Sequence, residues 1–309
     1  MQQNKKIYTN TLFVVLCALL CTALWGSATP FIKSGYEALK VDKNSVPSIM
    51  LFAGIRFFFA GIITVVIYSI VERKFLFPKK ENFKYVGIIS VFQTILQYIF
   101  FYVGLANTTG VKGAILSGSS AFFSILIASL IFRQEKLTFR KIIACIIGFA
   151  GVVLVNLNGL KLNFIFLGDG FVILSTLSLA FSSVFMKRFS KYENPVVISG
   201  YQFILGGIVM SIIGAAFGGT ISIASAKGIG ILIYLSFLSA IAYALWGILL
   251  KHNPVSKVTI FNFMTPVFGV ILSKLFLTET DSVSMINVFI ALLLICVGII
   301  TLNYQKNKR

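Results

Sequence analysis

Long apolar stretches separated by short polar segments dominate this sequence of 309 residues. A helix needs about 20 mostly apolar residues to cross the hydrocarbon core of a bilayer. The pattern predicts ten such helices and an all-α integral membrane protein. The expected spans are residues 11–32, 47–71, 83–106, 111–132, 139–155, 166–186, 196–217, 228–250, 255–277 and 283–302.

Composition supports this fold class, because 58% of the residues are hydrophobic and only 12% are charged. A net charge of +18 would suggest nucleic-acid binding in a soluble protein. Here the cations gather in alternate loops, where they orient the helices, so we expect a lipid bilayer and no nucleic acid as partner. Cations stay on the cytoplasmic side, which predicts a multi-pass protein of the cell membrane with both termini in the cytoplasm. The basic segments are residues 5–6, 73–84, 133–141, 187–191, 251–257 and 306–309.

Two hairpins, residues 117–156 and 261–303, share one pattern of apolar helix, short polar turn and second apolar helix. Glu135 and Glu279 hold the same place in them, and the segment at Arg56 likewise aligns with that at Gln202. Such matches predict an internal repeat with units 1–157 and 158–309. Five helices per unit is an odd number, so the second unit must enter the membrane from the opposite face. An inverted repeat of this kind is typical of transporters.

The chain resembles the ten-span carriers of the drug/metabolite transporter superfamily, EamA type. The resemblance implies a membrane carrier, often an exporter of amino acids or other small metabolites, with helices one, three, four, six, eight and nine around a central cavity. Where this family often has a proline in helix four, the chain has a run of small residues from Ser117 to Ser120. The matching features are Trp25-Gly26-Ser27, Arg56-Phe57, the two glutamate hairpins and Pro266-Val267.

Polar and aromatic side chains inside the apolar helices are candidates for substrate contact. Pro266 frees the carbonyl of Asn262, which predicts a bend lined by protein or water. For each candidate the alternative interpretation is helix packing or hydrogen bonding between helices. The candidate substrate-binding residues are Trp25, Gln93, Gln97, Ser117, Ser120, Ser178, Ser182, Tyr243, Trp246, Asn262 and Arg56.

Charge is scarce within the spans. Arg56 is the only charge well inside one, either as a ligand for a substrate carboxylate or as a structural cation bonded to helix carbonyls. Lys112 lies near a span end, where we expect it to reach the membrane surface, and Asp169 lies near another. Glu135 and Glu279 are expected to hold helix ends or to pair with loop cations. Proton-coupled export of organic cations usually needs a buried carboxylate. No Asp or Glu lies in the middle of an expected span, so neutral or zwitterionic substrates are favoured.

We therefore predict a transporter that is not an enzyme and that moves amino acids or similar amphipathic solutes by alternating access. An anion or nucleotide-sugar exchanger would need two or more basic residues in the cavity. A membrane enzyme acting on lipid would need clustered His, Asp or Glu near one face. A receptor without transport is a third alternative, which the inverted repeat disfavours. The four cysteines show no metal-ligand spacing, so no metal or cofactor is expected; the oligomeric state is left open.

Overall fold

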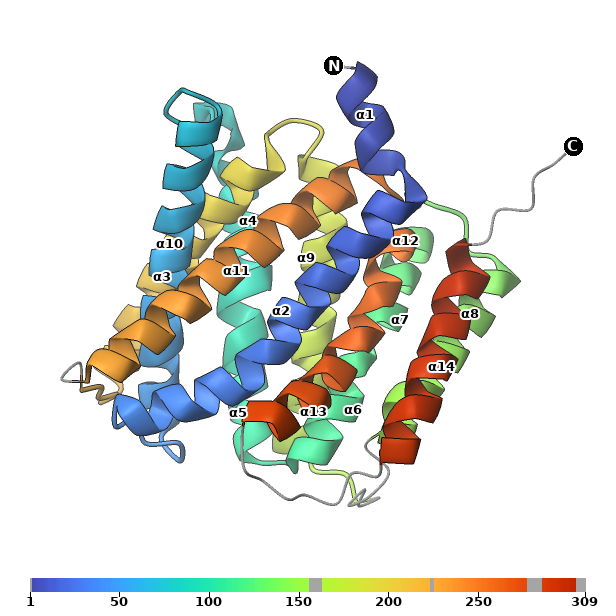
Figure 1. Ribbon diagram of the computed structural model, residues 1–309. Coiled ribbons are helices and arrows are strands. Elements are labelled where there is room, and N and C mark those ends of the chain that lie inside the picture. The colour runs from blue at the N-terminus through green and yellow to red at the C-terminus, as the bar shows by residue number, and fades with distance from the viewer. Residues whose placement is uncertain (1, 156–162, 223–224, 277–284, 304–309) are drawn as a thin grey trace, which may run out of the picture.

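The computed structural model describes residues 2–155, 163–222, 225–276 and 285–303 (Figure 1). All regular structure in this part of the chain is helical, and nine helices are long and apolar enough to cross a membrane. The prediction of an all-α membrane protein is confirmed. The fifth expected span forms α8, Phe139–Val155, whose 17 residues reach about 26 Å at helical rise. The total of ten spans stays a prediction.

The helices run back and forth between two ends of the bundle (Figure 1). We call the end where α1 begins and α14 ends the terminal end, and the opposite one the distal end. After α1 (Gln2–Thr9), the elements are α2 (Thr11–Ala38), α3 (Val46–Val71), η1 (Lys80–Asn82), α4 (Phe83–Ile89), η2 (Ser90–Leu96), α5 (Gln97–Ala106), α6 (Gly110–Gly118), α7 (Ser120–Leu126), η3 (Ile127–Ile131), α8, η4 (Phe166–Gly170), α9 (Phe171–Phe189), α10 (Pro195–Ala216), α11 (Ala226–His252), α12 (Val255–Thr259), η5 (Ile260–Phe263), α13 (Met264–Phe276) and α14 (Met285–Asn303).

Local sequence explains where several helices begin. Ser45 accepts a hydrogen bond from the backbone of Ser48 and caps α3, and Asn194 caps α10 in the same way through Val196. A proline follows each cap within the first turn, where its missing N–H removes no hydrogen bond. The first span was expected to end at residue 32, but α2 continues past Pro30 to Ala38. Pro30 therefore does not end this helix.

Glycines let two pairs of helices approach closely. A Cβ on Gly207 of α10 would lie 2.4 Å from the backbone nitrogen of Phe58 in α3. A Cβ on Gly298 of α14 would lie 2.7 Å from the carbonyl oxygen of Ala144 in α8. In lipid there is no hydrophobic driving force between helices. Small residues at helix crossings let the backbones approach closely, and van der Waals packing then holds the helices together. The α3/α10 pair lies at one side of the bundle and the α8/α14 pair at the other (Figure 1).

The remaining helices pack in matching combinations. Helix α2 packs against α11 and α13, and α9 packs against α5 and α7. If the first span corresponds to the sixth, the third to the eighth and the fourth to the ninth, each of these contacts has its counterpart. Helix α2 starts at the terminal end and α9 near the distal end (Figure 1). The contacts are those expected of the inverted repeat, whose boundary at residue 157 stays a prediction.

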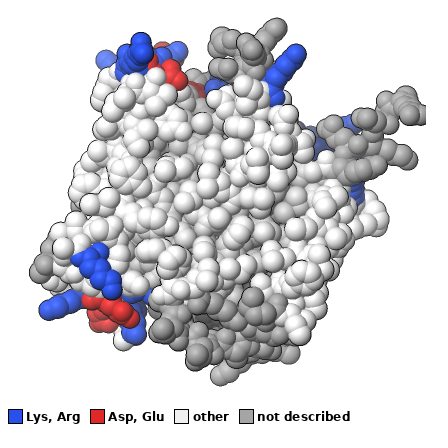
Figure 2. Space-filling model, in the orientation of Figure 1, with Lys and Arg blue, Asp and Glu red and all other residues white. Residues whose placement is uncertain are grey.

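The distribution of charge fits a bilayer. On the face drawn in Figure 2, the described Lys, Arg, Asp and Glu side chains gather toward the two ends, and a broad middle band carries none. Exposed side chains in the spans include Ile146, Leu205 and Leu293, which are 60%, 42% and 51% exposed. Apolar surface of this kind is stable against lipid chains rather than water.

Candidate functional site

An aromatic cluster joins α2 to α11 at the middle of the bundle. The ring centroid of Trp25 lies 5.1 Å from that of Tyr243 and 4.9 Å from that of Trp246. The hydroxyl of Tyr243 lies 3.3 Å from that of Tyr98 on α5. Tyr243 and Trp246 are buried and Trp25 is half-buried. The structure thus brings together three of the predicted site residues from helices more than 200 positions apart.

Gln93 and Gln97 lie in a distorted part of the third span. Residues Ser90–Leu96 form the π-helix η2, in which hydrogen bonds skip to the fifth residue. Both glutamine side chains are buried, and Gln97 directly precedes Tyr98, whose hydroxyl meets that of Tyr243. A π-helix inside a membrane span is costly and often marks a functional position. Gln97 therefore belongs with the aromatic cluster.

Several candidate residues carry buried polar atoms that have no hydrogen-bond partner. These atoms are Nε1 of Trp25, Oε1 of Gln97 and Oδ1 of Asn262. They are three of eight such side-chain atoms within the described residues. An unpaired buried polar atom costs about 1–3 kcal/mol, so such atoms attract water or a polar ligand.

The fourth and ninth spans are both interrupted, and the interruptions meet. Helix α6 ends at Gly118 and α7 begins at Ser120. At the break the hydroxyl of Ser119 donates to the carbonyl of Leu116 at 2.5 Å. In the ninth span the 3-10 segment η5 contains Asn262. The side-chain amide of Asn262 donates to Oγ of Ser120 at 3.5 Å.

The break predicted near Pro266 is confirmed, since the segment containing the carbonyl that this proline leaves free is not α-helical. The fourth span breaks without a proline, at Ser119, whose hydroxyl bonds back to Leu116. Ser27 and Ser182 make the same bond inside unbroken helices, so this bond alone does not explain the break. Ser117 lies half-buried, one residue before the end of α6.

The two candidate serines of α9 bind backbone carbonyls. Ser178 donates to the carbonyl of Phe92 in η2 at 2.7 Å, and Ser182 donates to Leu179 at 2.8 Å. Ser178 thus satisfies a carbonyl within the π-helix. These contacts correspond to the helix-packing interpretation, and a direct contact of either serine with substrate stays a prediction.

Arg56 crosses from α3 to α11. Its guanidinium donates to Oγ of Ser239 at 2.8 Å and to the carbonyl of Leu235 at 3.3 Å, and it lies over the ring of Phe57. Among the described residues, no carboxylate lies within ion-pair distance of it. These are the contacts of a structural cation.

The aligned residue Gln202 makes the corresponding crossing from α10 to η2. Its Oε1 accepts a hydrogen bond of 2.6 Å from Thr94. The second and seventh spans therefore attach to the eighth and third through polar contacts at matching positions. A role of Arg56 in substrate binding stays a prediction.

Glu135 holds the start of the ninth span, at the terminal end. It accepts hydrogen bonds from the backbone N–H of Ser256 at 3.1 Å and from its hydroxyl at 2.8 Å. Lys141 lies 3.3 Å from the same carboxylate. The expectation that Glu135 holds a helix end is confirmed, and its cation partner lies in the first turn of α8 rather than in a loop. Its counterpart Glu279 lies outside the described residues.

A buried ion pair at the distal end was missed from the sequence. Nζ of Lys112, in the first turn of α6, lies 2.7 Å from Oδ2 of Asp169 in η4. The expectation that Lys112 reaches the membrane surface is wrong, because it is only 7% exposed and is held by Asp169 and the carbonyl of Asn163. In the sequence, Lys112 and Asp169 lie at the beginnings of the fourth and sixth expected spans, which enter the membrane from the same side. This shared position was the signal that could have identified the pair.

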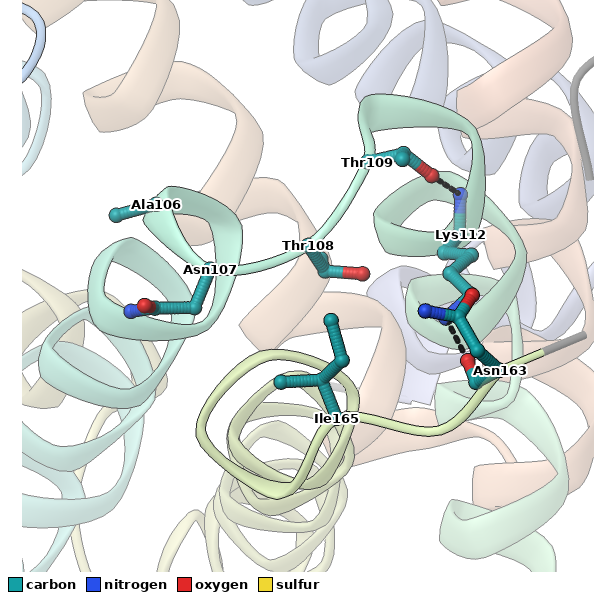
Figure 3. Close-up of a pocket in the computed structure, with 7 residues that line it drawn as sticks. All are labelled: Ala106, Asn107, Thr108, Thr109, Lys112, Asn163 and Ile165. Atoms are coloured by element: carbon teal, nitrogen blue, oxygen red, sulfur yellow. Dashed lines mark hydrogen bonds between the residues drawn. The ribbon is translucent and has the colours of Figure 1, made fainter. Parts of the chain in front are cut away.

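The same residues border a cavity of about 320 Å³, which we call the distal cavity. Its lining residues are Ala106, Asn107, Thr108, Thr109, Lys112, Asn163 and Ile165 (Figure 3). Asp169 lies directly behind this wall. Thr108 donates to its Oδ1, and the backbone N–H of Ile165 donates to its Oδ2 at 2.9 Å. No group of three or more His, Cys, Asp or Glu residues within the described ranges is arranged to hold a metal ion.

Comparison with known proteins places this site in context. Residues 12–157 and 166–304 match the sequence model of a protein family that is described as the EamA-like transporter family. An uncharacterized transporter of Archaeoglobus fulgidus is 25% identical over 84% of this chain and 88% of its own length. The uncharacterized transporter YvbV of Bacillus subtilis is 25% identical over all of this chain and 96% of its own.

Two further matches are more limited. A WAT1-related chloroplastic protein of Arabidopsis thaliana is 26% identical, and the match covers 58% of this chain and 45% of that protein. A solved crystal structure superposes with a TM-score of 0.74 at 16% identity, covering 94% of this chain and 96% of that one. At this identity the superposition supports the fold alone.

Proposed function

We propose, from the premise that the chain belongs to the EamA-like transporter family and is a multi-pass membrane transporter, that its cargo is an amino acid or a similar small amphipathic metabolite. The protein is proposed to lie in the cell membrane with both termini in the cytoplasm. The basic segments of the sequence support this orientation.

One observation carries the proposed cargo. Around the aromatic cluster, the polar groups are amides, hydroxyls and an indole, and several of their atoms have no partner in the structure. Aromatic faces suit an apolar side chain, and unpaired donors and acceptors suit a polar head group. Trp25 and Tyr243 are in ring contact, so a bound solute requires their helices to separate.

The interrupted spans supply a means of separation. Helices that break at Ser119 and around Asn262 can bend there with fewer α-helical hydrogen bonds to lose. Matched contacts in the two halves make two alternative arrangements close in energy, each open at one end of the bundle. We propose that substrate binding selects between them, which is alternating access.

The alternatives have less support. An anion or nucleotide-sugar exchanger needs several cations around the substrate, but Arg56 is already held by Ser239 and Leu235. A lipid-modifying enzyme needs a cluster of acid, base or metal-binding residues. Within the described ranges, no group of three or more His, Cys, Asp or Glu residues is arranged to hold a metal ion.

Counterflow in proteoliposomes tests the proposal, because exchange of labelled for unlabelled solute depends on neither the coupling ion nor the direction of net flow. We expect labelled leucine to enter vesicles loaded with unlabelled leucine. Gln97→Leu is expected to raise the half-saturating concentration about tenfold, since one buried hydrogen-bonding group at a binding site contributes about 1–2 kcal/mol. The matched control is Gln202→Leu. Gln202 is also buried and also has one unpaired amide atom, Nε2, but its Oε1 is bonded to Thr94 in η2.

Wild-type vesicles that exchange sugar phosphates but no amino acid would overturn the proposed cargo. Equal effects of Gln97→Leu and Gln202→Leu on half-saturation would remove Gln97 from the site.

A further inference from the structure

We infer that the distal cavity is a second binding site, separate from the aromatic cluster, for a small zwitterion whose carboxylate is held by Lys112. The inference rests on the proposed function for the kind of solute that meets the protein. The site itself stands on the cavity, the buried ion pair and the helix ends that converge there.

The cavity lies where one helix ends and the next begins. Ala106 and Asn107 are at the carboxyl end of α5, and Thr109 and Lys112 are at the amino end of α6. Helix carbonyls favour a cation and helix N–H groups favour an anion. The cavity therefore has a cation-favouring side and an anion-favouring side. Its volume of about 320 Å³ is at the lower bound of small-molecule sites, which begin near 300 Å³.

Lys112 lines the cavity and has one more N–H donor than the two acceptors that hold it. An ammonium group has three N–H donors, and Asp169 and the carbonyl of Asn163 take two of them. Figure 3 shows the Lys112 side chain extending toward Asn163, with Thr108 and Ile165 facing the space beside it. A carboxylate in the cavity can accept the third N–H without breaking the ion pair.

The charge of Asp169 selects the kind of carboxylate. The pair of Lys112 and Asp169 is neutral as a unit, and both side chains are more than 90% buried. A simple anion would place an uncompensated negative charge beside the buried Asp169, which is unfavourable at low dielectric. A zwitterion brings its own cation, which the carbonyl end of α5 favours.

The competing explanation is that the pair only ties α6 to η4. A purely structural pair predicts loss of stability on substitution and no change in ligand preference. The zwitterion site predicts that ligand preference follows the charge at position 169.

Three probes of one shape separate these explanations: leucine, isoamylamine, which lacks the carboxylate, and 4-methylpentanoate, which lacks the ammonium group. The full-length purified chain is used with Gln97→Leu to weaken the aromatic site. Trp25→Phe and Trp246→Phe remove the two native indoles of that site, and Ile165→Trp then provides the single fluorescent reporter, in the cavity wall. We expect a saturable change in emission with leucine, and affinities at least about tenfold weaker for the other two probes.

Substitutions of the pair give the decisive result. Asp169→Asn leaves Lys112 uncompensated, so the preference for leucine over 4-methylpentanoate is expected to fall at least about tenfold or to reverse. Lys112→Gln is expected to weaken both. The matched control Glu193→Gln, which neutralises a carboxylate at the terminal end, is expected to leave all three affinities unchanged.

Equal responses to leucine and isoamylamine, or a preference unaffected by Asp169→Asn in folded protein, would show that the pair is structural only. If neither pair variant folds, the ranking of the three probes on the reporter alone decides. Counterflow of leucine by the otherwise wild-type chain keeps the two proposals apart. Flux without a distal signal overturns this inference, and a distal signal without flux overturns the proposed function.

Discussion

At both the terminal and the distal end of the bundle, a carboxylate side chain is held next to the start of a helix, but the surroundings differ. Glu135 at the terminal end accepts from the backbone and hydroxyl of Ser256, and its partner Lys141 lies in the first turn of α8. Asp169 at the distal end pairs with Lys112 in a site with a cavity beside it. The first arrangement joins two spans, and the second combines a contact between spans with an adjoining cavity.

The difference teaches how to separate structural from functional charge in a membrane protein. A carboxylate whose acceptor positions are filled by backbone and hydroxyl groups does the work of a helix cap. A buried pair beside a cavity has room next to it for a solute, and the proposed distal site is built on that room. Both carboxylates lie near span ends in the sequence, so position along the chain alone does not tell them apart.

The largest expected effect is on the distal pair. Lys112→Met leaves Asp169 buried without its cation, and removing one partner of such a pair costs about 3–5 kcal/mol. We expect a marked fall in the thermal unfolding temperature of the purified protein. The double variant Lys112→Met/Asp169→Leu should recover most of the loss, because no unpaired charge remains. Equal losses in the single and double variants would contradict a coupled pair.

A smaller effect is expected at the terminal end. Glu135→Gln keeps the shape and one acceptor oxygen of the side chain, so we expect a loss of about 1–2 kcal/mol from the weakened contacts with Ser256. Ser256→Ala should lose a similar amount, and the two losses should not add in the double variant. Thermal unfolding measures all three. A loss from Glu135→Gln as large as that from Lys112→Met would erase the contrast between the ends.

The smallest effect concerns pH and Glu193, in the loop before α10. Burial opposes ionisation of this carboxyl, but hydrogen bonds from the side chain of Asn82 and the backbone N–H groups of Asn194 and Lys79 outweigh it, and the pKa of Glu193 lies below its ordinary value. A lowered folded-state pKa stabilises the fold above the unfolded pKa, and this contribution disappears as pH falls through the folded pKa.

Glu193→Gln should therefore lower the unfolding temperature at pH 7 and have little effect at the acid end of a pH series. The difference in unfolding temperature between wild type and variant, followed below about pH 4.5, checks the sign. A difference that grows as pH falls would contradict the assigned pKa direction.

Much of the architecture could be predicted because membrane spans are local features. Apolar length determines most helices, and Pro266 identified the interruption of the ninth span before any contact was known. The sequence also aligned Arg56 with Gln202, but the matching helices that the two side chains reach were seen only in the structure. The break at Ser119 was harder to predict, since serines that make the same hydrogen bond, such as Ser27, lie inside unbroken helices.

The sequence by itself determined the fold class, the membrane setting and the paired polar positions, because apolar length and internal repetition are written locally along the chain. Only the tertiary structure decided which of those polar residues meet. Trp25 touches Tyr243 and Trp246, and Lys112 reaches Asp169, through helix packing that no local pattern specifies. Ion pairs and orphaned polar atoms depend on distances of a few ångströms between distant segments, so they appear only when the helices are assembled.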